Sequence, residues 1–196
     1  ADGTFDNTFI APSTTGAGGV TAMVQDPVSQ KIYVTGTFVD WGGDAARDSL
    51  IRLNADGTLD GTFSSGAIGS LQGTSSRVTS LALAPDGKLY VGGSFFGVNI
   101  GGTPNYNYQY LVRLNTDGTV DTSFPTTSTL MPSQVIALAT LPDGRLYVAS
   151  NNGNNPQQLR RLLPNATVDA SFALAGNATN IATIAIQPDG KLLVGG

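Results

Sequence analysis

One motif recurs along this chain and restricts its fold more than any other feature. It consists of an apolar run, an Asp-Gly turn and a second apolar run, and in residues 81–95 it reads LALAPDGKLYVGGSF. Related copies occupy residues 136–150 and 181–196, and residues 21–38 carry a weaker copy in which DPVSQ replaces the tight turn. Asp-Gly between apolar runs is the strongest short-range signal for a β-hairpin, because glycine accepts a positive φ and aspartate tolerates it or bonds the backbone. The motif therefore predicts a series of hairpins, each closed by a two-residue turn.

A second motif alternates with the first and gives the chain a period. It reads LIRLNADGTLDGTF in residues 50–63 and LVRLNTDGTVDTSF in residues 111–124, and related copies lie at residues 1–9 and 159–172. Successive copies are roughly 50 to 60 residues apart, and periods of about this size built from short strands are typical of propellers, solenoids or arrays.

Each period divides into four short strands, here called A to D. Strand A precedes the PDG turn and strand B follows it, as in residues 78–83 and 88–95. Strand C carries the LxRLN core and strand D the TxDxxF segment, as in residues 111–115 and 119–124. A single sheet of this kind cannot bury both faces, and stacking such sheets around an axis solves that problem. The sequence therefore predicts an all-β fold: a β-propeller, or a partial propeller, of repeated four-stranded antiparallel blades.

The expected organisation is a single propeller repeat region over residues 1–196. Strand D of one blade is expected at residues 1–9, blades at about 20–63, 78–124 and 135–172, and a half-blade at 181–196. Because propellers usually need about four to eight complete blades, the chain is expected to be a fragment of a longer chain.

Composition argues against several classes of function. The chain has no cysteine and no histidine, which removes thiol catalysis, the commonest general base, the usual zinc ligand and the Ser-His-Asp triad. A net charge of −4 without a basic cluster argues against nucleic acid as a partner. No apolar run approaches the about 20 residues that a membrane span requires.

These motifs resemble the delta-60 repeat, a β-propeller repeat of unknown function. The family pattern, RLNxDGxLDxSF followed by QPDGKxLVGGxF, is matched at residues 52–63, 113–124, 84–95 and 187–196. Proteins with such repeats are typically large secreted bacterial proteins, so the resemblance implies an extracellular or cell-surface location. The family has no established catalytic residues, so the resemblance implies none here.

The repeated aspartates admit a structural and a functional interpretation. An aspartate recurs three residues before a phenylalanine in every copy of the second motif, at Asp6, Asp60, Asp121 and Asp169. These carboxylates could bind calcium, or they could serve the structure by accepting backbone N–H groups or by pairing with the recurring arginines of strand C, Arg52, Arg113 and Arg161. Repetition in every period favours the structural interpretation, so no metal site is predicted and calcium is the only cofactor considered.

Two further repeated features are expected to serve packing. The phenylalanines that end strand D, such as Phe63 and Phe124, are predicted to pack between blades. The pair Gly92-Gly93 is predicted to permit a close approach between blades or a bulge.

Candidate ligand-binding residues lie in the loops that do not repeat. In an up-and-down sheet the A–B and C–D turns lie at one end, while B–C and D–A connections of variable length lie at the other, and such loops commonly carry binding. The candidates come from three successive B–C loops: Asp40, Trp41, Asp44, Tyr106, Tyr108, Asn152 and Asn154. Aromatic faces beside amides and carboxylates suit a glycan or a peptide, although the same residues could simply pack the loops onto the rim.

The leading hypothesis is a non-catalytic extracellular or cell-surface module for binding or scaffolding, whose variable loops recognise a glycan or a protein. Other domains or repeats of the same parent chain are further possible partners. One alternative is a purely structural spacer in a large secreted protein. Another is a glycan-acting hydrolase or lyase with Asp40 and Asp44 as acid and base, because such chemistry needs two carboxylates at a defined separation.

Overall fold

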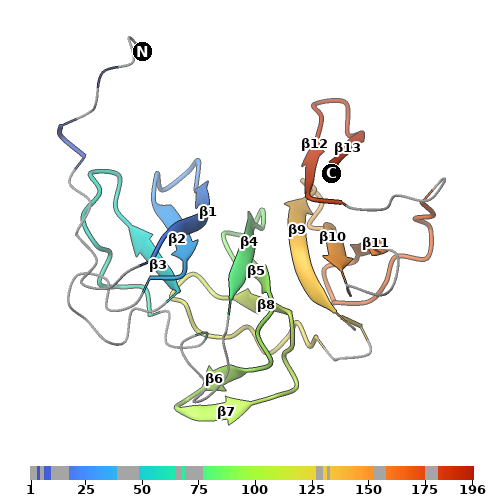
Figure 1. Cartoon of the computed structure of the whole chain (residues 1–196), viewed down its shortest axis with the longest axis horizontal. Helices are drawn as coiled ribbons and strands as arrows, with labels where there is room; N and C mark the ends of the chain where they lie inside the picture. Colours follow the sequence, from blue (N-terminus) through green and yellow to red (C-terminus); the bar gives the residue numbers. More distant parts are fainter. Residues whose placement is uncertain are drawn as a thin grey trace.

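The computed structural model describes residues 4, 7–9, 18–38, 49–64, 68, 77–126, 130–131, 133–151, 158–174 and 181–196. All regular structure within these residues is β-strand, and successive sheets lie side by side in chain order (Figure 1). The all-β prediction is confirmed. No helix in the described part of the chain has the length and apolarity needed to cross a membrane.

Three blades and a half-blade account for most of the strands. Blade 1 contains β1 (Val20–Gln25), β2 (Ile32–Gly36) and β3 (Leu50–Leu53), paired antiparallel in that order. Blade 2 contains β4 (Val78–Leu83), β5 (Leu89–Gly93) and β8 (Leu111–Leu114). Blade 3 contains β9 (Gln134–Thr140), β10 (Leu146–Asn151) and β11 (Gln158–Leu162). The half-blade is the hairpin of β12 (Thr183–Ile186) and β13 (Leu192–Gly195).

A separate hairpin interrupts the B–C connection of blade 2. Its strands are β6 (Val98–Ile100) and β7 (Thr103–Asn105), and they pair with each other in their own sheet. Figure 1 shows this hairpin at the end of the blade opposite to the β4–β5 turn. The end with variable connections therefore carries secondary structure that the sequence did not predict.

Strand D is shorter than the sequence predicted. In each blade it contributes one antiparallel bridge to strand C, at Leu53–Leu59, Leu114–Val120 and Leu162–Val168. The reason lies in the following aspartate: in blade 1, Asp60 Oδ1 accepts the backbone N–H of Thr62 at 3.0 Å and so bends the chain away from the ladder. Each four-stranded blade is therefore a three-stranded sheet with a one-pair fourth strand.

The A–B turns of blades 2 and 3 and of the half-blade are three-residue loops, so the prediction of two-residue turns at these Asp-Gly pairs is wrong. In blade 2 the N–H of Gly87 donates to the carbonyl of Ala84 at 2.9 Å, and the N–H of Ala84 donates to Lys88 at 2.8 Å. Gly87 alone takes a positive φ, of 82°, while the Asp86 carboxylate accepts the N–H of Lys88 at 3.2 Å. A turn followed by one left-handed residue matches the twist of the two strands, which explains the need for glycine at this third position.

Apolar residues of neighbouring blades form shared cores. One cluster joins Tyr33 and Phe63 of blade 1 to Val91 of blade 2, and the next joins Tyr90 and Phe124 to blade 3. The phenylalanine ring packs in a T-shaped arrangement against a strand-B tyrosine, with ring centroids 5.4 Å apart for Tyr33–Phe63 and 5.2 Å apart for Tyr90–Phe124. The prediction that these phenylalanines pack between blades is confirmed for both residues.

Gly92 and Gly93 have the packing role that the sequence predicted. A Cβ atom on Gly92 would lie 2.5 Å from Cγ1 of Val135 in blade 3, and one on Gly93 would lie 2.0 Å from the carbonyl oxygen of Arg77. The register of β4 against β5 also shifts between Val78 and Ser80, as a bulge does. Both parts of the prediction, the close approach and the bulge, are confirmed.

Candidate functional site

The inner strands of the three blades, β1, β4 and β9, lie next to one another and are joined by threonine side chains. The Thr21 hydroxyl donates to the carbonyl of Val78 at 3.0 Å, and the Thr79 hydroxyl donates to the carbonyl of Val135 at 2.7 Å. These bonds link each inner strand to the start of the next one. All three strands therefore end together, and their A–B turns surround a common space.

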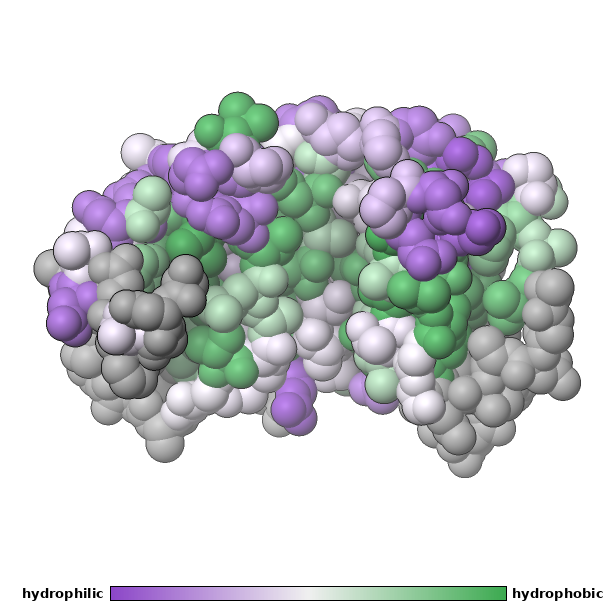
Figure 2. All heavy atoms as spheres, turned by 90° about the horizontal axis from the view of Figure 1, so that it is seen from above, coloured by the Kyte–Doolittle hydropathy of each residue, from purple (hydrophilic) through white to green (hydrophobic). Residues whose placement is uncertain are grey.

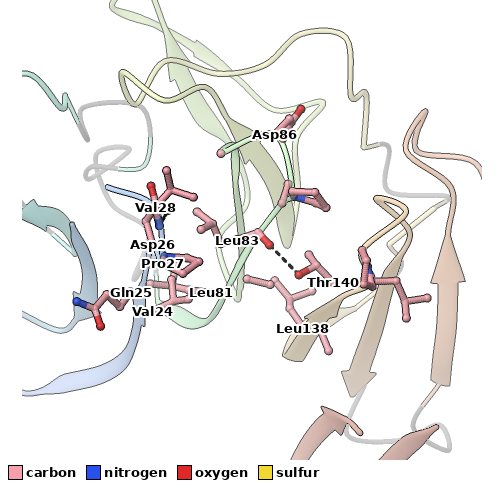
Figure 3. Close-up of a pocket in the computed structure, with 17 residues that line it drawn as sticks. Val24, Gln25, Asp26, Pro27, Val28, Leu81, Leu83, Asp86, Leu138 and Thr140 are labelled. Atoms are coloured by element: carbon pink, nitrogen blue, oxygen red, sulfur yellow. Dashed lines mark hydrogen bonds between the residues drawn. The ribbon is translucent and has the colours of Figure 1, made fainter. Parts of the chain in front are cut away.

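That space is an open cleft with a volume of about 750 Å³, between the A–B turns of blades 1, 2 and 3 (Figure 3). We call it the axial cleft. Its walls are apolar, formed by inner-strand residues and by one proline from each turn: Val24, Leu81, Leu83, Leu138, Leu141, Pro27, Pro85 and Pro142. Across it, the Thr140 hydroxyl donates to the carbonyl of Leu83 at 2.7 Å. Figure 2 shows apolar side chains gathered in the hollow of the arc and hydrophilic ones on either side.

Carboxylates are the only ionisable groups among the described residues that line the axial cleft. They belong to Asp26 and Asp86, one in each of two A–B turns. A hydrogen bond from the Ser29 hydroxyl, 2.5 Å long, is the main reason why the pKa of Asp26 lies below its ordinary value. None of the described residues that line the cleft is aromatic. The cleft thus combines an aliphatic surface with negative charge at its edge.

The repeated aspartates lie elsewhere, each in an ion-pair network with two cations. In blade 1, Asp60 Oδ2 accepts from Arg52 Nε at 2.6 Å and from Lys31 Nζ at 2.5 Å. In blade 2, Asp121 Oδ2 accepts from Arg113 Nε and from Lys88 Nζ, both at 2.7 Å. The predicted aspartate–arginine pairing is therefore confirmed.

The network of blade 3 follows the same pattern with an arginine in place of the lysine. Arg161 Nε lies 2.7 Å from Asp169 Oδ2, and Arg145 Nη1 lies 3.5 Å from the same oxygen. Asp6 lies outside the described residues.

These networks keep the carboxylates ionised. Burial acts to raise the pKa of Asp60, but hydrogen bonds from Lys31, Thr62 and Arg52 outweigh it and hold that pKa below the ordinary value. A hydrogen bond from Ser171 lowers the pKa of Asp169 to about 2, and Arg161 adds to the effect. A carboxylate that is already paired with two cations is a poor metal ligand. No group of three or more metal-ligating side chains occurs among the residues that the structure describes.

Most of the loop residues predicted to bind a ligand cannot be placed. Asp40, Trp41, Asp44, Asn152 and Asn154 lie outside the described residues.

The two tyrosines of the blade 2 loop can be placed, and they differ. Tyr106 is 60% exposed just after β7, whereas Tyr108 is 7% exposed and belongs to the core shared by blades 1 and 2. Tyr108 therefore packs the loop onto the blade, and Tyr106 presents a ring to solvent. Tyr106 directly follows β7, and the β6–β7 hairpin lies at the end of blade 2 opposite to the β4–β5 turn (Figure 1), which is one of the turns around the axial cleft.

Sequence reasoning missed two features of these surfaces. Phe96, which is 47% exposed, adds a second aromatic ring to the loop end of blade 2, where it packs edge-on against Tyr110. Sequence reasoning also missed the axial cleft, because the turns around it are short and repetitive, whereas binding is expected in the variable loops at the opposite end. The available signal was the apolar character of both faces of strand A, as in LALA at residues 81–84, where Leu81 and Leu83 remain half-buried.

Comparisons with known proteins agree with this architecture. The model of the family described as "Domain of unknown function (DUF5122) beta-propeller" matches residues 31–63, 84–124 and 141–172, more than half of the chain. No curated protein sequence matches the chain.

Several solved structures are similar to the chain at low sequence identity. One is described as a "putative gluconolactonase", with 16% identity and a TM-score of 0.49 over 88% of this chain and 53% of that one. Another is the Cps50 (Swd1) β-propeller domain of Myceliophteria thermophila, with 12% identity and a TM-score of 0.43 over 94% of this chain and 64% of that one. A third is an extracellular domain from B. thetaiotaomicron, with 14% identity and a TM-score of 0.38 over 94% of this chain and 26% of that one. The chain thus spans about half to two thirds of the first two structures.

Proposed function

The chain belongs to the DUF5122 β-propeller family, and on that premise we propose that it is a non-catalytic binding module of an extracellular or cell-surface protein. Its ligand is a protein segment that inserts an aliphatic side chain into the axial cleft and places a lysine or arginine at the edge. The extracellular location is supported by the resemblance of the repeats to those of large secreted proteins.

The observation that carries this proposal is the lining of the axial cleft. Its aliphatic walls can bury an apolar side chain, and the carboxylates of Asp26 and Asp86 can attract a neighbouring cation. Sugar rings are commonly bound against aromatic faces, and the lining that the structure describes for this cleft contains no aromatic ring. The chemistry therefore favours a protein segment over a glycan at this position.

The enzyme alternative has little support among the described residues. General acid–base catalysis at neutral pH needs a carboxyl group whose pKa is raised toward that pH. Asp60, Asp121 and Asp169 instead have lowered pKa values and are held by basic side chains. Asp40 and Asp44, the pair considered for a hydrolase or lyase, lie outside the described residues.

A peptide library displayed on phage tests the proposal, with the immobilised chain as bait. We expect enrichment of segments that combine an aliphatic residue with a neighbouring lysine or arginine. Replacing the exposed Asp86 by lysine should weaken their binding about ten-fold, because the cation at the cleft edge then meets a like charge.

The matched control for this experiment is Tyr106→Ser, which changes the opposite end of the blade and should leave binding unchanged. Binding that survives Asp86→Lys but disappears in Tyr106→Ser would reject the axial cleft as the site.

A second candidate function rests on the exposed rings of Phe96 and Tyr106. Two aromatic rings at the loop end of blade 2 can stack on the apolar face of a sugar. A glycan array probed with the chain and with Tyr106→Ser separates this function from the first. Glycan binding that is lost in Tyr106→Ser and unchanged in Asp86→Lys would establish glycan recognition. The absence of binding to any glycan on the array would reject it.

A further inference from the structure

The middle strand of each blade makes it possible to compare the half-blade with three complete ones. Strands β2, β5 and β10 each pair on both edges, with the A strand on one side and the C strand on the other. Among the described residues, β13 pairs only with β12, and no described strand lies along its second edge. An open strand edge is a template for the addition of another strand.

The side chains of β13 are more exposed than those at the same positions in the middle strands of the complete blades. The equivalents of Leu193 in the complete blades are Tyr33, Tyr90 and Tyr147, and all three are at most 5% exposed. Leu193 is 53% exposed and its neighbour Val194 is 42% exposed. Two large apolar side chains in the middle strand of the half-blade therefore lie in solvent, although their counterparts lie in the core.

The charge of Lys191 indicates which kind of segment would cover Leu193 and Val194. The cation that follows each A–B turn bonds to the aspartate of strand D in the complete blades, as Lys31 does with Asp60 and Lys88 with Asp121. Lys191 occupies the same position in the half-blade, but its side chain is 77% exposed and, within the described part of the chain, it pairs with Asp189 of its own turn alone. The position of Lys191 thus matches a strand-D aspartate in register with it.

Arg161 of blade 3 gives a third, independent indication that a C–D hairpin would fit next to β13. Arg52 Nη1 donates to the carbonyl of Thr116, and Arg113 Nη1 donates to that of Pro164 at 3.0 Å. Both carbonyls belong to the C–D turn of the following blade, one residue before its Asp or Asn. The corresponding Nη1 of Arg161 has only the Tyr147 hydroxyl, at 3.4 Å, among the residues that the structure describes.

We propose that the open edge of β13 binds a C–D hairpin of the repeat's own type, with the pattern LxRLNxDGxxDxxF. The hairpin adds its C strand antiparallel to β13, its aspartate pairs with Lys191, and the carbonyl before its Asp-Gly turn accepts from Arg161. The register follows from blade 1, where Tyr33 faces Arg52 and Val34 faces Ile51. Leu193 then faces the arginine of the incoming hairpin. This surface is separate from the axial cleft, and the proposal does not depend on the function assigned to that cleft.

A peptide with the sequence of residues 50–63, labelled with fluorescein, tests the proposal by anisotropy titration against the folded chain. We expect saturable binding that Lys191→Gln weakens about five-fold, the upper range for a single exposed ion pair. A peptide carrying Asp60→Asn should bind the chain with Lys191 and the Lys191→Gln variant equally, because the pair is lost in both cases.

Two controls separate recognition by the half-blade from other effects. Arg145→Gln changes the equivalent cation in blade 3, where strand D is already present, and should leave peptide binding unchanged. A peptide of the same composition in scrambled order should not bind.

Three results would overturn the proposal. They are the absence of saturable binding, binding that Lys191→Gln does not affect, and a dimer of the chain, detected by light scattering, that the peptide does not dissociate. The last result would mean that a second copy of the chain covers β13.

Discussion

Glycine takes a positive φ at the third position of every Asp-Gly turn among the described residues, but the space around it differs from one turn to the next. Gly118 has a φ of 90°, and a Cβ on it would lie 2.2 Å from the carbonyl oxygen of Ser64 in blade 1. Gly190 has a φ of 80°, and nothing lies within 4 Å of the same position. The first glycine is required for conformation and for the contact between blades, and the second for conformation alone.

This difference predicts unequal effects of the same substitution. Gly190→Ala should lower the free energy of unfolding by about 1 kcal/mol, the typical cost of a left-handed alanine. Gly118→Ala should lower it by roughly 3 kcal/mol, because it also pushes the turn off Ser64, whose N–H donates to the Asp117 carbonyl at 2.9 Å. Urea denaturation of both variants, followed by circular dichroism, checks the prediction. Equal losses would show that the contact with Ser64 does not constrain the turn.

The blade is the scale at which the repeated arginine acts. In blade 2, the Arg113 guanidinium bonds to Asp121, Ser123 and the Tyr90 hydroxyl, and it lies 4.6 Å from the centre of the Phe124 ring. One side chain thus ties strands B, C and D together over the aromatic pair. The same guanidinium bonds to the next blade, whereas that of Arg161 does not do so within the described residues.

Replacing each arginine by lysine should separate these two roles. Lysine can keep one ion pair but cannot span several acceptors. We expect Arg161→Lys to lower the free energy of unfolding by about 1.5 kcal/mol and Arg113→Lys by roughly 3 kcal/mol, the difference being one bond from a charged donor to the carbonyl of the next blade. Chemical denaturation of both variants measures the two values. A loss at Arg161 as large as that at Arg113 would contradict an inter-blade role for Arg113.

At the scale of the whole molecule, the repeated aspartates make stability depend on pH. Asp60, Asp121 and Asp169 have lower pKa values in the folded chain than in the unfolded one. The unfolded chain therefore binds protons first as the pH falls. The stabilisation from these groups is complete above the ordinary aspartate pKa of 3.8 and is lost as the pH falls from there through about 2, the pKa of Asp169.

We therefore expect the free energy of unfolding to fall steeply between about pH 4 and pH 2. Asp121→Asn should be less stable at neutral pH and should show a shallower decrease, since one of the titrating carboxylates is gone. Denaturation at a series of pH values, at constant ionic strength, measures both effects. A stability that is constant or rises over this interval would rule out the three ion-pair networks as its source.

Agreement between sequence and structure is best where a local pattern has one physical solution. Asp-Gly between apolar runs can only turn the chain back, so the hairpins at residues 81–95 and 136–150 were predictable. The length of the loop was not, because two-residue and three-residue hairpin loops both place glycine at a residue with a positive φ. Strand D was predicted too long for a similar reason: TxDxxF has a strand-like composition, but the Asp60 carboxylate bonds its own backbone and ends the ladder.

The sequence by itself determined the β class, the order of the strands and the period, and it favoured a structural role for the repeated aspartates. All of these depend on neighbours within one repeat, and the same pattern recurs in each repeat. Only the tertiary structure decided that Tyr108 is buried while Tyr106 is exposed, and that the axial cleft lies at the end with the short turns. Those properties arise from the contact of one blade with the next, which brings together residues more than 50 positions apart, such as Thr21 and Val78.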